Sequence, residues 1–128
     1  MENYTVTILE SSKELTAREK IRARNFANAA SFDQMLTDDS ESFSFAPLAY
    51  TVLAVHNESS ENKDYTVFLI EDTANNLYRT GSEAFFSRFK EIFNTMREDA
   101  PGEDYTISVF KRPSTKYKGK FVLLCQID

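Results

Sequence analysis

The chain has 128 residues, a length typical of one domain, and its 41% hydrophobic content supports a buried core. Its net charge of −5 argues against a general duplex-DNA binder, because such proteins are usually basic. The first residues lack the basic and apolar pattern of a signal peptide, and no stretch approaches the roughly 18 apolar residues of a membrane span. We therefore expect a single cytoplasmic domain over residues 1–128 that does not contact a membrane.

The N-terminal third gives a mixed pattern. Residues 3–9 alternate as a strand does. Residues 13–19 have the propensity of a short helical turn, and the alternation that follows favours a long, bent strand over about 20–34. A single helix over 13–30 is the alternative. The polar, acidic stretch 37–45 is typical of a loop.

The middle of the chain is easier to interpret. Leu48–His56 is a nearly continuous apolar run with β-branched and aromatic residues, which predicts a central strand. Tyr65–Glu71 has the pattern of a strand covered on both sides, and Leu77–Thr80 predicts a short strand after a turn.

The clearest local signal is a helix over residues 83–97. Its apolar residues recur at helical spacing, and Ser82 is a suitable N-cap. The stripe consists of Phe85, Phe86, Phe89, Ile92, Phe93 and Met96. We interpret this stripe as core packing.

The last segment combines two strands with a basic loop. The strands are Tyr105–Phe110 and Phe121–Ile127, and the loop between them covers residues 111–120. Its five cations make the segment 105–128 strongly positive within an acidic chain. A basic, aromatic hairpin on an acidic protein indicates a surface that holds an anionic polymer.

The order of these elements predicts the fold. Three strands, a helix and two more strands are the topology of an OB-fold, which is a mainly β, five-stranded Greek-key barrel. The amphipathic helix would lie between the third and fourth strands, and the basic loop would join the fourth and fifth. An open α+β sheet with the helix on one face is the competing fold.

The sequence gives little support for catalysis. The only histidine, His56, and the only cysteine, Cys125, lie in different apolar strands, so nothing requires them to form a dyad. The carboxylate pairs at 38–39 and 71–72 are typical of solvated loops and have no EF-hand spacing. We therefore expect a non-enzymatic protein without catalytic residues, a metal or another cofactor.

Nucleic-acid binding has a better physical basis. Single strands are held by cations along the phosphates and by aromatic rings that stack on bases. In an OB-like barrel the first strand, the second and third strands and the last loop surround one groove. The candidate residues are Arg22, Arg24, Phe26, Tyr65, Tyr78, Arg79, Lys111, Arg112, Lys116, Tyr117, Lys118 and Lys120.

A resemblance points in the same direction. The runs 53–58, 63–72, 77–85 and 112–121 resemble a family of small single-stranded DNA-binding proteins of OB-fold type from phages and mobile elements of Gram-positive bacteria. The resemblance covers most of the chain. It implies sequence-tolerant protection of single-stranded DNA in replication, recombination or transfer, alongside replication or recombination proteins. RNA is the alternative ligand.

A second hypothesis uses the acidic segments. Residues 33–41 and 58–72 could imitate a nucleic acid, which would make the chain a phage-type inhibitor or DNA mimic that binds a basic host protein. It predicts no binding to oligonucleotides. Under either hypothesis the strand over 3–9 has an edge through which a homodimer could form.

Overall fold

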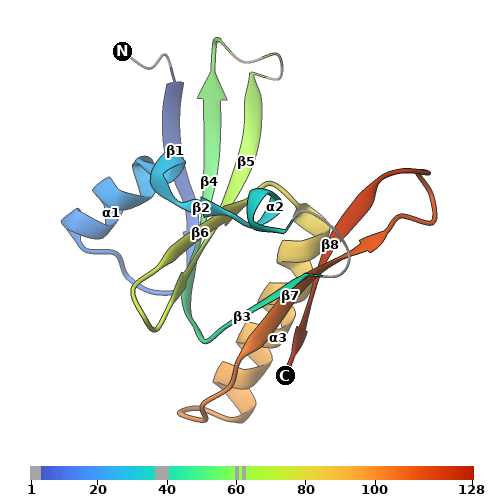
Figure 1. Cartoon of the computed structure of the whole chain (residues 1–128). Coiled ribbons are helices and arrows are strands. Elements are labelled where there is room, and N and C mark those ends of the chain that lie inside the picture. Colours follow the sequence, from blue (N-terminus) through green and yellow to red (C-terminus); the bar gives the residue numbers. More distant parts are fainter. Residues whose placement is uncertain (1–3, 37–40, 60, 62) are drawn as a thin grey trace.

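The computed structural model describes residues 4–36, 41–59, 61 and 63–128. Strands predominate, with 44% strand and 27% helix, and they form two sheets. Sheet A has the strand order β1-β4-β5-β6-β2 and sheet B has the order β3-β7-β8 (Figure 1).

Sheet A contains most of the apolar runs in the sequence. Its strands are β1 (Tyr4–Ser11), β4 (Pro47–Asn57), β5 (Asp64–Asp72), β6 (Leu77–Thr80) and β2 (Ala30–Ser31). Neighbours are antiparallel except for the short parallel pair β2–β6. The turn between β5 and β6 is held by Asp72, whose carboxylate accepts hydrogen bonds from the backbone N–H of Ala74 (2.9 Å) and Asn76 (2.8 Å). Most residues of β4 and β5 are buried, as their apolar composition predicts.

Sheet B shares one chain segment with sheet A. Its strands are β3 (Ser42–Phe45), β7 (Ile107–Pro113) and β8 (Phe121–Ile127). Only Ala46 separates β3 from β4, so the segment 42–57 contributes a strand to each sheet. β7 and β8 form an antiparallel hairpin that projects from the body of the fold (Figure 1).

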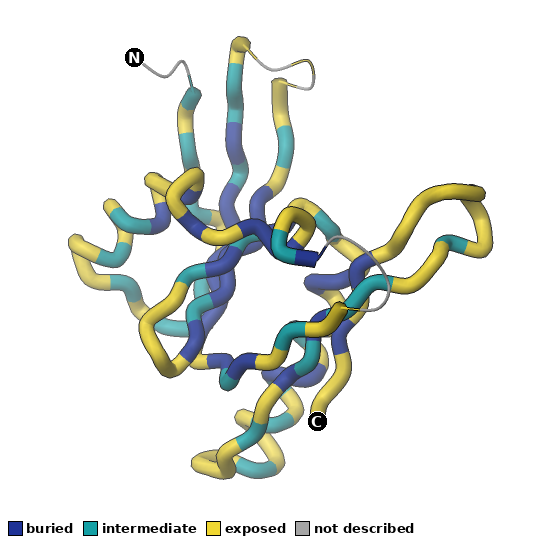
Figure 2. Tube along the Cα trace, viewed as in Figure 1, coloured by how far each residue is buried: buried dark blue, intermediate teal, exposed yellow. Residues whose placement is uncertain are grey.

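The long helix α3 (Glu83–Asp99) and both sheets contribute to the main core. The Ser82 hydroxyl caps the helix by accepting a hydrogen bond from Phe85 N–H at 3.2 Å. Phe85 and Phe89 are fully buried, together with Ile107 and Val109 of β7. Figure 2 shows that buried stretches lie toward the middle of the molecule, whereas the tip of the β7–β8 hairpin is exposed. The apolar stripe of the helix is therefore core packing, as the periodicity predicts.

A smaller core lies under the N-terminal helices. α1 (Ala17–Arg24) starts with a capping box, in which the Thr16 hydroxyl and the Glu19 carboxylate each accept the other residue's backbone N–H. α1 and the 3-10 helix η1 (Phe26–Asn28) bury Ala23 and Phe26 against apolar residues of sheet A. The short helix α2 (Phe32–Met35) instead places Phe32 in the main core.

Two predictions about local structure are wrong. Residues 20–34 do not form a bent strand, because they contain most of α1, then η1, β2 and most of α2. The alternative, a single helix over 13–30, is not observed either, because the helical part is divided into α1 and η1. Within the predicted loop 37–45, β3 pairs with β7, while residues 37–40 lie outside the described residues. The predicted strands at 48–56, 65–71, 77–80 and 121–127 and the helix at 83–97 are confirmed, and the strand at 3–9 is confirmed from Tyr4, the first described residue.

The β-rich class is confirmed in its coarse form. Within the described ranges no strand pairing joins sheet A to sheet B, so the closed barrel is not observed. No helix in the described part of the chain is long and apolar enough to cross a bilayer.

Candidate nucleic-acid interface

The basic hairpin, defined here as residues 110–124 of β7, β8 and their loop, has an ordered loop. The Ser114 N–H donates to the Lys120 carbonyl at 2.8 Å, which closes the loop. The Ser114 hydroxyl accepts the N–H groups of Lys116 (3.2 Å) and Tyr117 (3.0 Å). Gly119 has φ +81°, a left-handed conformation that glycine adopts without strain. The sequence therefore fixes the backbone that carries the loop side chains.

The loop side chains point to solvent. Tyr117 is 60% exposed, and the Lys116 ammonium lies 5.5 Å from the centre of its ring. Lys118 and Lys120 are exposed as well. Among the described residues no carboxylate forms an ion pair with Lys116, Lys118 or Lys120. The loop therefore presents positive charge and an aromatic face together.

The base of the hairpin extends this surface. The Arg112 guanidinium lies 4.4 Å from the centre of the Phe110 ring. Phe110 is opposite Leu124 and Arg112 is opposite Val122, so these side chains share the face of sheet B away from the core. The sequence analysis did not select Phe110, Val122 and Leu124. Side chains alternate between the two faces of a strand, so the apolar residues Ile107 and Val109 could have shown that Phe110 lies on the outer face.

Lys111 points to the other face of the hairpin. Its ammonium donates to the backbone carbonyl of Asp33 in α2 at 3.0 Å. This bond ties the hairpin to the N-terminal part of the chain. The predicted hairpin therefore carries Arg112, Lys116, Tyr117, Lys118 and Lys120, whereas Lys111 lies on its opposite face.

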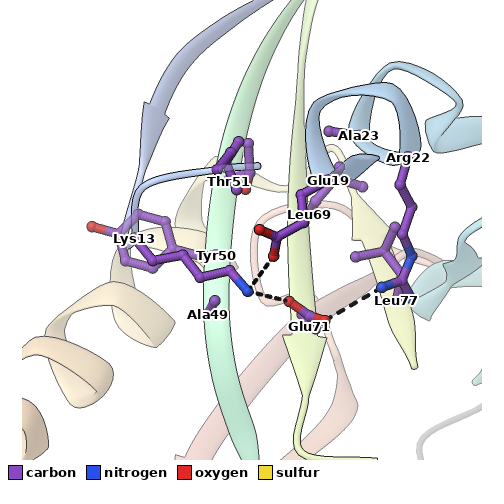
Figure 3. A pocket seen from close by; sticks show the side chains of 11 residues that line it. Lys13, Glu19, Arg22, Ala23, Ala49, Tyr50, Thr51, Leu69, Glu71 and Leu77 are labelled. Atoms are coloured by element: carbon purple, nitrogen blue, oxygen red, sulfur yellow. Dashed lines mark hydrogen bonds and ion pairs between the residues drawn. The ribbon is translucent and has the colours of Figure 1, made fainter. Parts of the chain in front are cut away.

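Arg22 belongs to a different cluster, on sheet A (Figure 3). The Glu71 carboxylate of β5 forms ion pairs with the Lys13 ammonium at 3.1 Å and with the Arg22 guanidinium at 3.3 Å. The Lys13 ammonium also forms an ion pair with the Glu19 carboxylate at 2.5 Å. The hydrogen bond from Lys13 is the main cause that lowers the pKa of Glu19 to about 2. The cavity beside these residues measures only about 30 Å³, room for one or two water molecules. We interpret the cluster as the contact that holds α1 on the sheet.

Two of the predicted aromatic residues are not at the surface. Phe26 is 9% exposed and packs edge-to-face on Tyr4, with ring centres 5.8 Å apart. Tyr78 is 5% exposed, its ring stacks on Phe32, and its hydroxyl donates to Asp72 at 2.8 Å. The pKa of Tyr78 is raised to about 12, mainly by burial and secondly by the hydrogen bond to Asp72. Both rings are core residues, which corrects their assignment to the binding surface.

The other predicted residues contact parts of the chain other than the hairpin. Arg79 of β6 donates its Nε–H to the Ala29 carbonyl at 3.2 Å, which supports the β2–β6 pair. Tyr65 of β5 is half-buried against the smaller core, and Arg24 is exposed on α1. α1 and the hairpin lie on opposite sides of the view in Figure 1. The structure does not bring these residues into one surface with the hairpin.

The titratable groups considered for catalysis are separated or occupied. His56 of β4 bonds Asp64 (2.6 Å) and Glu58 (2.5 Å), which raise its pKa, Asp64 more than Glu58. Cys125 is buried in sheet B, and burial raises the pKa of its thiol to about 11. In the part of the chain that the structure describes, no group of three or more His, Cys, Asp or Glu side chains is arranged to hold a metal ion.

Comparison with protein families, with curated proteins and with solved structures gave no match for this chain. The resemblance to phage single-stranded DNA-binding proteins therefore stays a prediction.

Proposed function

We propose that this protein binds single-stranded DNA without catalysing a reaction, and that the basic hairpin is its binding surface. The observation that carries the proposal is the exposed pair of Lys116 and Tyr117 beside two further lysines without an ion pair in the described part. Lysines neutralise phosphates and release counterions, and a ring stacks on any base. This chemistry supports sequence-tolerant binding.

The strand pairing supports an OB-like arrangement as part of the proposal. β4, β5 and β6 form an antiparallel meander, β7 and β8 form a hairpin, and the shared segment 42–57 links the two sheets. An OB-fold is a partly open barrel whose last loop contacts oligonucleotides. In this proposal the basic hairpin takes the place of that loop.

The outer face of sheet B offers a path for more than one nucleotide. The Arg112–Phe110 pair repeats, on the strands, the cation–aromatic arrangement that Lys116 and Tyr117 have in the loop. Both pairs belong to the same hairpin, so one strand of DNA could contact them in succession. Protection of DNA in replication, recombination or transfer is the role that fits such binding.

The test is fluorescence anisotropy of a labelled single strand of about 30 nucleotides, a length that covers more than one typical site. The protein is titrated at low and moderate salt, with duplex DNA and single-stranded RNA as competitors. We expect binding that prefers the single strand and weakens with salt. No binding at tens of micromolar protein in low salt would refute the proposal, and a pull-down for a basic protein partner would then test the DNA-mimic hypothesis.

A further inference from the structure

The strand β8 is an edge strand of sheet B, and α3 packs against it. It is the last strand of sheet B and pairs with β7 along one side, and within the described residues no strand pairs with its other side. Natural edge strands are usually protected by charges, prolines or bulges. β8 (Phe121–Ile127) contains no charged residue and no proline, and its register with β7 is regular. β1, an edge of sheet A, carries Glu10 and an irregular register after Ile8.

The direction of the backbone groups at this edge follows from two hydrogen bonds. Asp128 N–H donates to the Thr106 carbonyl (3.0 Å), and the Lys120 carbonyl accepts from Ser114 N–H (2.8 Å). Even-numbered residues of the strand therefore direct their backbone toward β7. Because the direction alternates along a strand, the odd-numbered residues direct N–H and C=O to the open edge. These are Phe121, Leu123, Cys125 and Ile127.

We propose that this edge binds β8 of a second copy of the chain, antiparallel and centred on Leu124. In this register Phe121 is opposite Ile127 of the second copy, and Leu123 is opposite its Cys125. Every backbone group at the open edge then has a partner. The contact is two-fold symmetric, which closes the assembly as a dimer and joins the two copies of sheet B into one continuous sheet.

Charge complementarity favours a second copy over another extended segment. The same register places Lys120 of one copy opposite Asp128 of the other, at both ends of the contact. Lys120 has no carboxylate partner in the described part of the chain. The Asp128 carboxylate is held at the strand end by hydrogen bonds from Thr106 (2.7 Å) and Ser108. No like charges meet along the strand itself.

The exposed side chains fit this arrangement. Leu124 is 38% exposed and Val122 is 42% exposed, on the outer face of sheet B. At the two-fold axis Leu124 meets its own copy in a pair without hydrogen bonds, in which Cα atoms are about 4.5 Å apart. Pairing would thus bring Leu124 into contact with Leu124 of the second copy and place Val122 beside its Gln126. The inference does not depend on the proposed DNA binding.

Cysteine cross-linking tests the register. Leu124→Cys thiols of two copies would lie within the distance that a disulfide spans. Gln126→Cys is the matched control, because its two copies would be offset by about 13 Å along the strands. The native Cys125 thiol is buried with a raised pKa and should stay unreactive. With diamide as the oxidant we expect a covalent dimer of Leu124→Cys and little of Gln126→Cys. Equal cross-linking of both, or none, would overturn the proposal.

Sedimentation velocity over a range of concentrations tests the edge itself. Leu124→Lys places like charges opposite each other and should raise the dimer dissociation constant roughly tenfold or more. Val122→Lys adds the same charge opposite Gln126 and should have a smaller effect. Leu9→Lys, on β1, should have none. A wild-type monomer at roughly 100 µM, or a dimer that responds to Leu9→Lys instead, would refute pairing through β8.

Discussion

Removal of the Tyr117 ring tests the proposed binding surface most directly. Stacking of a base on an aromatic side chain is worth about 1–3 kcal/mol, so Tyr117→Ala should raise the dissociation constant for single-stranded DNA roughly 5- to 150-fold. Because Tyr117 is 60% exposed, the free energy of unfolding should change by less than about 0.5 kcal/mol. Tyr117→Phe keeps the ring and should bind like the wild type.

The lysines of the loop give a second, independent readout. Each phosphate contact on a single strand contributes about −0.7 to the slope of log K against log salt concentration. The triple variant Lys116→Ala, Lys118→Ala, Lys120→Ala should therefore reduce the magnitude of the slope by about 2. Anisotropy titrations at several salt concentrations measure this slope.

A matched control removes the same charge from another surface. Arg18, Lys20 and Arg24 are exposed on α1, and their triple alanine variant should leave the slope nearly unchanged. The reasoning would be refuted if Tyr117→Ala and the hairpin triple variant bound with wild-type affinity and slope while circular dichroism showed an intact fold. If only the α1 variant showed a smaller salt dependence of binding, α1 and not the hairpin would be the binding surface.

Further predictions concern stability and titration. Phe32 is fully buried among aromatic rings, so Phe32→Ala should lower the free energy of unfolding by about 3–5 kcal/mol in denaturant titrations. Thr16→Ala removes the acceptor for the Glu19 N–H and should cost about 1 kcal/mol, whereas Thr16→Ser should cost little. NMR titration of the single histidine, His56, should give a pKa above 6.5, and Asp64→Asn should lower it. Because this pKa is raised by folding, its contribution to stability is complete below pH 6.5 and is lost as pH rises through the pKa of the folded state.

The sequence predicts the elements whose apolar periodicity matches their burial. α3 is an example, because its phenylalanines recur at helical spacing and all of them face the core. α1 has no such stripe, because Ile21 is 59% exposed and Ala23 is the one buried residue of the helix. Without a stripe at helical spacing, the alternation of apolar and charged residues in this segment resembles that of a strand. The capping box at Thr16 was the available clue to its start.

The binding surface could be predicted only where local sequence decides exposure. Lys116 and Tyr117 lie in a loop between two strands, and such loops are at the surface. Tyr78 and Phe26 have the same chemistry but are covered by residues distant in the sequence, such as Phe32 and Tyr4. No pattern within their own segments shows that their rings are covered, because tertiary packing determines their exposure.

The single residue between β3 and β4 has a consequence for how the molecule unfolds. Because Ala46 is the one residue between β3 and β4, the connection between the two sheets cannot lengthen. The Ala46 carbonyl also accepts a hydrogen bond from the Thr73 N–H at 2.9 Å. Separation of sheet B from sheet A would pull directly on β4, an interior strand of sheet A. Amide hydrogens of β4 and of β7 should therefore exchange with similar opening free energies, as members of one cooperative unit.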